Sequence, residues 1–255
     1  MFKSLYTKVF IGIVVFDSKS KIYVELLDRR NNITNVIIKD FNSLVVDDEM
    51  YIFISKFTNK TPFYYISILD NSDSQGMIAT CLKDELSNKI NADIFHHTCY
   101  KDKWAFYVAK QDIDILKNNY IKVGLDFIFS PFAVMIEFFK DKIDQEMVLL
   151  VLIQDDSFTI SVFDEGKLLY SDHQTVEHNN DSYKFLSIKR SIEHFYKDLT
   201  YDSGFINSLY IADTTDSDEE LKHHFMDEMF LDANTYNIEL HVEICRLAKA
   251  ELNGV

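Results

Sequence analysis

Three short runs of mainly apolar residues, separated by polar turns, open the chain. They cover residues 8–17, 21–27 and 33–40, with turns at 17–20 and 29–32. Runs of this length that are rich in β-branched residues, or that alternate apolar with polar positions, predict strands. Because both turns are short, we expect the three strands to form an antiparallel start to a sheet.

The same plan returns in the second half of the chain. Further strands are predicted at 147–154, 158–163 and 167–171, with 174–177 extending that edge. An amphipathic helix follows at 182–199, with one apolar stripe. The stripe consists of Phe185, Ile188, Ile192, Phe195 and Leu199. A meander followed by helices therefore occurs twice.

The segments around these blocks complete an α/β pattern. Strand-like runs lie at 50–55, 63–69, 104–109, 121–129, 208–212 and 237–242, and helices are predicted at 80–90, 112–120, 132–140, 217–230 and 244–252. Ser130 and Pro131 are typical of a capped helix start. The polar segment 140–146 is the expected joint, so we predict a first lobe at 1–143, with 41–120 as a candidate inserted subdomain, and a second lobe at 144–255.

This duplicated layout resembles actin-like (ribonuclease H-type) folds. The block MVLLVLIQDDSFTISVFDEGKLLYSDHQTV is similar to the strand–turn–strand–turn–strand region of the PilM/GspL family of actin-like platform proteins. The matching positions are the strand 158–163 and the turn Asp164-Glu165-Gly166-Lys167-Leu168. The resemblance implies a two-lobed α/β actin-like fold, each lobe a mixed sheet that starts with an antiparallel meander and is flanked by helices.

In nucleotide-binding relatives, the resemblance implies, glycine-containing turns hold phosphates through backbone N–H groups. Here the turns 16–20 and 154–157 lack glycine, and Asp155 and Asp156 would face the phosphate. The loop 211–216, expected near adenosine, lacks paired glycines too. We therefore expect no cofactor. A nucleotide-binding actin-like ATPase with divergent phosphate loops, in which Asp155 and Asp156 hold Mg²⁺ beside a phosphate, is the alternative.

Composition and charge limit the kinds of partner and the cell compartment that we expect for this chain. The formal net charge of −15 opposes binding to nucleic acid or to anionic lipid. No apolar stretch approaches the ~18 residues of a membrane helix, so we expect no membrane insertion by this chain. Three cysteines, widely spread and without a CxxC pair, fit a reducing cytoplasm. The resemblance implies a cytoplasmic protein peripheral to the inner membrane, either wholly soluble or ending ahead of an anchor.

No motif predicts catalysis or a metal site. Neighbouring residues on a strand point to opposite faces, so His96 and His97 are not expected to chelate together, and the second half of a zinc site is missing. Signatures of nucleophilic catalysis are absent from the sequence. We predict a non-enzymatic protein and keep a stand-alone enzyme of unknown chemistry as a third hypothesis. Spacing favours burial of Phe132, Phe138 and Phe139 over an exposed peptide groove.

An acidic segment near the end of the chain is the candidate partner-binding surface. Its residues are Asp213, Asp216, Asp218, Glu219 and Glu220. Acidic residues at this place also favour the start of a helix, which is the plainer interpretation. The resemblance implies an assembly protein of a type II secretion, type IV pilus or DNA-uptake apparatus. Its partners would be a motor ATPase and inner-membrane assembly subunits, with a homodimer as a further option.

Overall fold

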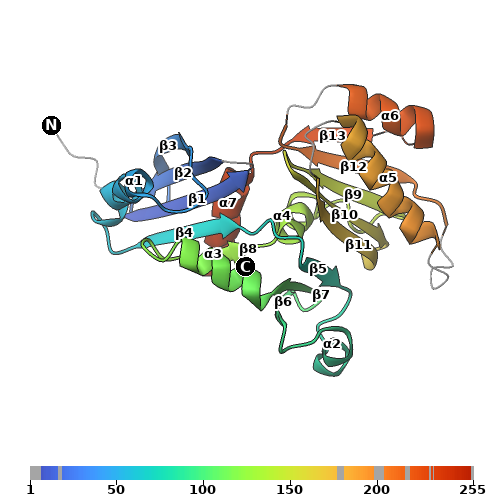
Figure 1. Ribbon diagram of the computed structural model, residues 1–255, viewed down its shortest axis with the longest axis horizontal. Helices are drawn as coiled ribbons and strands as arrows, with labels where there is room; N and C mark the ends of the chain where they lie inside the picture. The colour runs from blue at the N-terminus through green and yellow to red at the C-terminus, as the bar shows by residue number, and fades with distance from the viewer. Residues whose placement is uncertain are drawn as a thin grey trace. The chain divides into compact units, whose positions relative to one another are not determined.

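The computed structural model describes residues 7–16, 19–176, 181–197, 204–215, 219–229, 231 and 233–253. The chain divides into two compact units (Figure 1). Unit 1 is made of Met1–Asp70, Ile113–Phe129 and Glu239–Val255, and unit 2 of Asn71–Asp112 and Ser130–Ile238.

A five-stranded mixed sheet with the order β3-β2-β1-β4-β8 forms unit 1. Its meander consists of β1 (Lys8–Phe16), β2 (Lys19–Leu27) and β3 (Ile33–Phe41), each antiparallel to the next. Two parallel strands, β4 (Tyr64–Leu69) and β8 (Phe127–Phe129), extend the sheet beyond β1.

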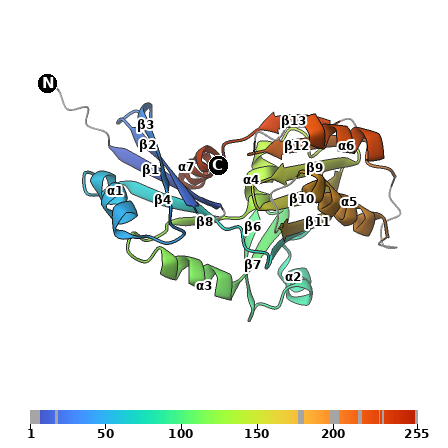
Figure 2. The ribbon, with the colours of Figure 1, turned by 45° about the horizontal axis from the view of Figure 1, so that its top comes forward.

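Helices cover both faces of this sheet (Figures 1 and 2). On one face Ile11 and Ile13 of β1 pack with Met50 and Phe53 of α1 (Asp48–Thr58) in a continuous apolar core. Helix α3 (Lys110–Asn119) adds Leu116 to the edge of that core. Because side chains alternate along a strand, Gly12 points to the other face, where α7 (Leu240–Asn253) packs against β1, β4 and β2.

Unit 2 repeats the same plan with the strand order β11-β10-β9-β12-β13. The meander consists of β9 (Val148–Ile153), β10 (Ser157–Asp164) and β11 (Lys167–Thr175). The parallel strands are β12 (Ser208–Asp213) and β13 (Ala233–Asn237). The expected occurrence of a three-stranded antiparallel meander in each half of the chain is confirmed.

Three helices pack against the five-stranded sheet of unit 2: α4 (Pro131–Phe138), α5 (Asp181–Lys197) and α6 (Glu219–Met229). Four residues of the predicted stripe are buried in the core together with Phe158 and Ile160 of β10, namely Phe185, Ile188, Ile192 and Phe195. Leu199, the fifth, lies outside the described residues. Helix α4 contacts β9 and β10. Its start is capped as predicted, because the Ser130 hydroxyl accepts a hydrogen bond from the Phe132 amide and Pro131 occupies the first turn.

A small antiparallel sheet of the order β5-β7-β6 also belongs to unit 2. Its strands are β5 (Gln75–Ile78), β6 (Phe95–Tyr100) and β7 (Trp104–Ala109), and the short helix α2 (Lys83–Lys89) lies between β5 and β6 in the chain. The strand-like runs of the sequence included β7 but neither β5 nor β6.

Three predicted strands are wrong or too long. Residues 50–55 lie in α1, whose N-cap Asp47 accepts a hydrogen bond from the Met50 amide at 2.8 Å. Of residues 121–129, only Phe127–Phe129 form a strand. Residues 237–242 do not form one, because β13 ends at Asn237 and α7 starts at Leu240.

The packing units differ from the lobe boundaries expected at residues 143 and 144. Helix α7 packs in unit 1, although it follows unit 2 in the chain, and Asn71–Asp112 pack in unit 2. Unit 1 is therefore assembled from three separate segments.

Candidate functional site

The turn between β9 and β10 is where the resemblance expects a phosphate to bind. It has no glycine: Gln154, Asp155, Asp156 and Ser157 lead from one strand to the next, and the Gln154 amide donates to the Ser157 carbonyl at 2.9 Å. Side chains of Gln154 and Ser157 are buried and those of the two aspartates half-buried. The turn offers carboxylates where an anion would need donors.

Asn71 braces this turn from a distant part of the chain. Its Nδ2 donates to Asp156 Oδ1 at 3.0 Å and to Ser157 Oγ at 2.8 Å, while its Oδ1 accepts from Gln154 Nε2 at 2.7 Å. One asparagine thus engages three of the four turn residues. Its amide occupies hydrogen-bonding groups that would otherwise be available to a ligand of the turn.

A second bridge runs parallel to the first. Asp73 accepts hydrogen bonds from the backbone amide and the hydroxyl of Thr175, at 2.8 and 2.9 Å. Thr175 lies on β11 opposite Ser157 of β10. The segment that follows β4 therefore lies across the ends of two strands and closes this corner of the sheet.

A row of buried polar residues continues from the turn along β10 and β11. Thr159 pairs with His173 and Ser161 pairs with Ser171 across the two strands. The Thr159 hydroxyl lies 2.8 Å from His173 Nδ1, and the Ser171 hydroxyl donates to the Met77 carbonyl at 2.9 Å. The Ser161 Oγ and the His173 Nε2 are buried without a hydrogen-bond partner in the described structure.

His173 is held in its neutral form. Burial lowers the pKa of its imidazole below the ordinary value, and the Asn71 backbone and the carboxylates of Asp73 and Asp172 only partly oppose this. The ring also lies edge-on to Phe132, with centroids 6.3 Å apart. A neutral histidine held in this way fills the interior and carries no charge for a phosphate.

The loop after β12 is closed by its own side chains. Oδ1 of Asp213 accepts from the amide and the hydroxyl of Thr215, at 2.8 and 2.7 Å. The Asp213 carbonyl accepts from the Ile238 amide at 3.0 Å. Asp213 is 9% exposed, so its side chain is turned inward.

The other candidate residues are only partly described. Asp216 and Asp218 lie outside the described residues, as does the bend Asp17-Ser18 of the first turn. Glu219 and Glu220 form the first residues of α6. The predicted acidic surface stays a prediction.

The excess negative charge belongs to one unit. Unit 1 carries 13 basic and 13 acidic residues, whereas unit 2 carries 13 basic and 28 acidic residues. The net charge of −15 is thus that of unit 2 alone. The net charge of unit 2 would attract a basic partner, whereas unit 1 has no net charge to do so.

The alternative of an exposed aromatic groove for a peptide does not apply. Phe132 is fully buried, Ile136 is 1% exposed and Phe139 is 3% exposed. Phe138 is half-buried and lies edge-on to Phe139 and Tyr236. Burial in the core, the interpretation that spacing favoured, is confirmed.

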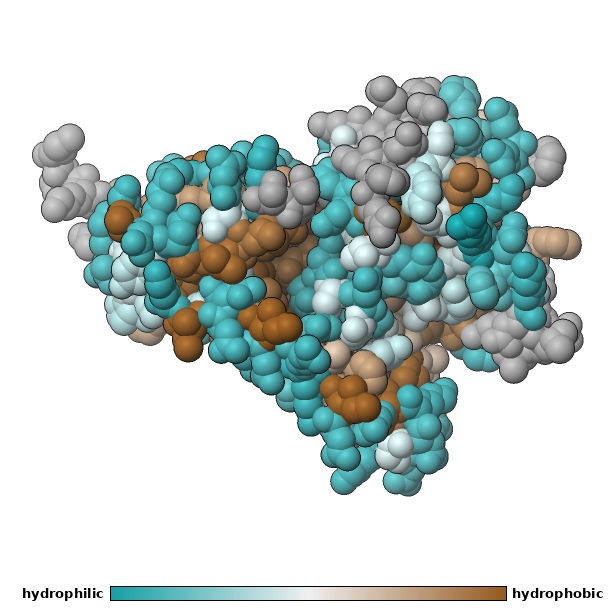
Figure 3. Space-filling view, viewed as in Figure 1, coloured by the Kyte–Doolittle hydropathy of each residue, from teal (hydrophilic) through white to brown (hydrophobic). Residues whose placement is uncertain are grey.

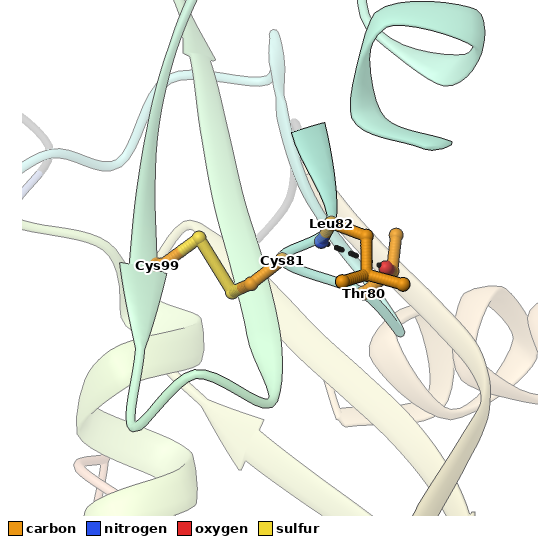
Figure 4. Close-up of a disulfide and its surroundings, with 4 residues drawn as sticks. All are labelled: Thr80, Cys81, Leu82 and Cys99. Carbon is orange, nitrogen blue, oxygen red and sulfur yellow. Dashed lines mark hydrogen bonds between the residues drawn. A yellow bond between two sulfur atoms is a disulfide. The ribbon is translucent and has the colours of Figure 1, made fainter. Parts of the chain in front are cut away.

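The small sheet corrects our interpretation of the cysteines. Cys81 and Cys99 form a disulfide, with Cα atoms 5.7 Å apart, and Cys245 is free and buried (Figure 4). The exposed His96 and His97 lie beside Cys99 on β6, opposite Val108 and Tyr107. Within the described residues, no three His, Cys, Asp or Glu side chains gather as metal ligands.

Asn71 is the residue that sequence reasoning missed. It follows Asp70 at the end of an apolar strand, a place where asparagine is common in any turn. Nothing in the spacing connects it with Asp156, which is 85 residues away. The aspartates of the turn were visible in the sequence, but their partner was not.

Two five-stranded sheets of identical strand plan, each starting with a meander, define the actin-like ATPase fold. Residues 6–136, half of the chain, match the family described as "Domain of unknown function (DUF8569)", and the chain belongs to that family. Residues 178–253 match a second description, "Domain of unknown function (DUF8341)". Comparison with curated protein sequences gave no match.

Solved structures support the fold. A Bacteroides thetaiotaomicron protein with an actin-like ATPase fold and unknown function is similar at a TM-score of 0.61 and 13% identity, over 96% of this chain and 99% of that chain. A chain of the PilM–PilN type IV pilus biogenesis complex is similar at 0.61 and 10% identity, over 95% and 98%. At such identities the likeness establishes the fold alone.

A third similarity is weaker. The activator of the 2-hydroxyisocaproyl-CoA dehydratase from Clostridium difficile, solved with bound ADPNP, gives a TM-score of 0.43 at 10% identity over 98% of each chain. That score is too low for a comparison of sites. Among the described residues no helix has the length and apolarity needed to cross a bilayer.

Proposed function

We propose that this chain is a non-enzymatic assembly protein that works by binding other proteins. The apparatus would be a type IV pilus, type II secretion or DNA-uptake system, where the chain would link a motor ATPase to inner-membrane subunits from the cytoplasmic side. The fold shared with a chain of the PilM–PilN complex supports this choice of apparatus.

The braced β9–β10 turn carries the proposal. A phosphate at this turn would meet Asp155 and Asp156 and would have to displace the amide of Asn71 from three partners. Breaking these contacts leaves half-buried polar groups unsatisfied, at about 1–3 kcal/mol for each group. An ATPase needs a turn whose backbone N–H groups are free to donate hydrogen bonds to the phosphate without rearrangement.

Nucleotide titration tests the non-enzymatic part. A ligand that binds only the native state at 100 times its Kd stabilises it by about 2.7 kcal/mol, which raises the Tm of a chain this long by several degrees. We expect millimolar ATP–Mg²⁺ and ADP–Mg²⁺ to leave the Tm unchanged. A saturable rise would favour the alternative, an actin-like ATPase with divergent loops.

We also propose that the acidic start of α6 in unit 2 contacts a basic surface of the partner. The supporting observation is the charge, since all of the excess carboxylates belong to unit 2. Asp213 is not part of this surface, because its carboxylate is engaged with Thr215. The proposed contact residues are therefore Asp216, Asp218, Glu219 and Glu220.

Charge reversal tests this contact. Lysine at Asp218, Glu219 and Glu220 should reduce capture of the motor ATPase and inner-membrane subunits several-fold, and the capture by the unmodified chain should weaken with salt. The matched control places lysine at three acidic residues of unit 1, Asp40, Asp114 and Glu251, which are exposed. Equal capture by the two triple variants would remove α6 from the contact while leaving the assembly role intact.

A further inference from the structure

We propose that Cys81 and Cys99 form a reversible redox switch that fastens or releases helix α2. The bridge joins the residue two positions before α2 to strand β6, across 18 positions of sequence. Figure 4 shows the two sulfur atoms between β6 and the segment that leads into the helix. This inference does not depend on the proposed assembly role.

The bridge is open to reagents. Cys99 is exposed and Cys81 half-buried, so a small thiol or disulfide can reach the sulfur of Cys99. Accessible disulfides are the ones that exchange. The third cysteine does not compete, because Cys245 is buried in unit 1 and its burial raises the pKa of its thiol.

Helix α2 has few other attachments. It is seven residues long, its N-cap Leu82 provides no side-chain hydrogen bond, and Leu86 is its one buried residue. The cluster beneath it contains only Leu86, Ile90 and Ala105 as buried members. A helix of this length is not stable without tertiary contacts. The disulfide is therefore a large part of what keeps α2 in place.

The remainder of the small sheet is held independently of the bridge. The Tyr100 hydroxyl donates to Glu137 of α4, the Ser171 hydroxyl donates to the Met77 carbonyl, and Trp104 packs edge-on against Phe163 of β10. Burial would raise the pKa of Glu137, but the hydrogen bonds from Tyr100 and Lys140 and the charge of Lys101 lower it to about 2. Reduction should consequently release α2 without releasing the sheet.

Release would uncover an apolar surface. Ile78, Phe95 and Tyr107 pack against the small cluster under α2, and Leu82 and Ile94 beside it are already 65% and 52% exposed. Hydrophobic side chains gather over the small sheet in Figure 3. The dithiol form would thus present a larger apolar patch to a protein partner than the disulfide form.

The chemistry balances with a low-molecular-weight disulfide as the oxidant. The Cys99 thiolate attacks a sulfur of glutathione disulfide and releases one glutathione, forming a mixed disulfide. The Cys81 thiolate then attacks the Cys99 sulfur and releases the second glutathione. Two thiols lose two electrons and two protons in total, and glutathione disulfide takes them up. Excess glutathione reverses both steps.

Hydrogen exchange on the full chain tests the switch. The chain is equilibrated with glutathione buffers of defined ratio, its thiols are counted by alkylation and mass spectrometry, and amide exchange is followed. We expect two further thiols on reduction and exchange in Lys83–Lys89 at least about tenfold faster, because an 18-residue loop loses its closure. Exchange in β7 and β10 should not change.

A matched variant separates reduction from side effects of the buffer. Cys81→Ser should show the fast exchange of α2 in both buffers, whereas the unmodified chain should show it only in the reducing one. Equal protection of α2 in the two buffers overturns the switch, as does a bond that glutathione neither forms nor breaks. Loss of protection throughout unit 2 on reduction also overturns it, because the bridge would then support the whole unit.

Discussion

The side-chain nitrogen of Asn71 lies 3.0 Å from a carboxylate oxygen of Asp156, although 85 residues separate the two in the chain. Replacement by alanine removes this bond and those to Ser157 and Gln154. We expect Asn71→Ala to lower the free energy of unfolding by about 2 kcal/mol, because half-buried polar groups lose their partner. Urea denaturation measures this loss.

Two further variants test whether the lost hydrogen bonds cause the destabilisation in Asn71→Ala. Asn71→Asp should destabilise more than the alanine variant, because it places a carboxylate against Asp156. Asn118→Ala changes an exposed asparagine and should cost less than about 0.5 kcal/mol. If Asn71→Ala lowers the free energy of unfolding no more than Asn118→Ala does, the hydrogen bonds of Asn71 do not stabilise the turn.

Gly12 allows α7 to approach the sheet of unit 1. A Cβ at this position would lie 2.4 Å from the His241 carbonyl oxygen and 2.9 Å from Cys245 Sγ. Because the first of these is a backbone atom, α7 must shift. We expect Gly12→Ala to destabilise the protein by about 1–3 kcal/mol, measured by thermal or urea unfolding.

Gly204 provides the comparison. A Cβ there meets no atom within 4 Å. Gly204→Ala should therefore leave stability within about 0.5 kcal/mol of the unmodified chain or raise it slightly. Similar losses for the two variants would show that close packing of α7 is not the reason for Gly12.

Glu25 is 2% exposed, and its carboxylate contacts two partners. Tyr23 donates to one carboxylate oxygen at 2.9 Å and Lys249 of α7 donates to the other at 2.7 Å. Lys249→Ala should cost up to about 3 kcal/mol, because a buried charge loses its counterion. Adding Glu25→Gln should recover part of the loss. Lys197→Ala, which breaks an exposed pair with Glu193, should cost less than about 0.5 kcal/mol.

Because His173 is buried, we expect the free energy of unfolding to fall in mild acid. Burial lowers the pKa of its imidazole in the folded chain, so the unfolded chain binds the proton first. The contribution of neutral His173 is complete above about pH 6.5 and declines as the pH falls from there towards the folded pKa. We expect the Tm to fall over this interval, and His173→Gln to make the fall less steep.

His241 in unit 1 contributes with the same sign, because burial lowers the pKa of its imidazole too. The His173→Gln variant should therefore keep some pH dependence between pH 7.5 and 5. An unchanged slope in that variant would mean that His173 does not titrate on unfolding. Glu137 does not disturb this interval, since its pKa is about 2 when folded.

The meanders were predictable because their signals are local. Alternating or β-branched runs bounded by polar turns need no information from elsewhere, and β1, β2 and β10 follow them closely. The start of α4 was equally local, set by Ser130 and Pro131. The cap at Asp47 was local as well, but the apolar run after it was interpreted as a strand and proved to be α1.

What remained hidden depends on contacts between distant segments. The Ile238 amide donates a hydrogen bond to the Asp213 carbonyl directly after the end of β13. The residue pattern within 237–242 does not indicate this contact. The pairing of Cys81 with Cys99 depends on a small sheet whose β5 includes Gly76, which weakens a strand signal. At the candidate site, the position of Asp155 and Asp156 in a turn could be predicted from the sequence, whereas their contact with Asn71 could not.

Helix α7 belongs to unit 1 but follows all of unit 2 in the chain. During synthesis, the sheet face around Gly12 stays without its helix until residues 240–253 have left the ribosome. Because unit 1 is made of three separate segments, one cut in the chain cannot separate it from unit 2. Deletion of Leu240–Asn253 would expose Phe10, Tyr23 and Glu25, which α7 contacts. Dissecting this protein will call for circular permutation, with a new start placed in unit 2.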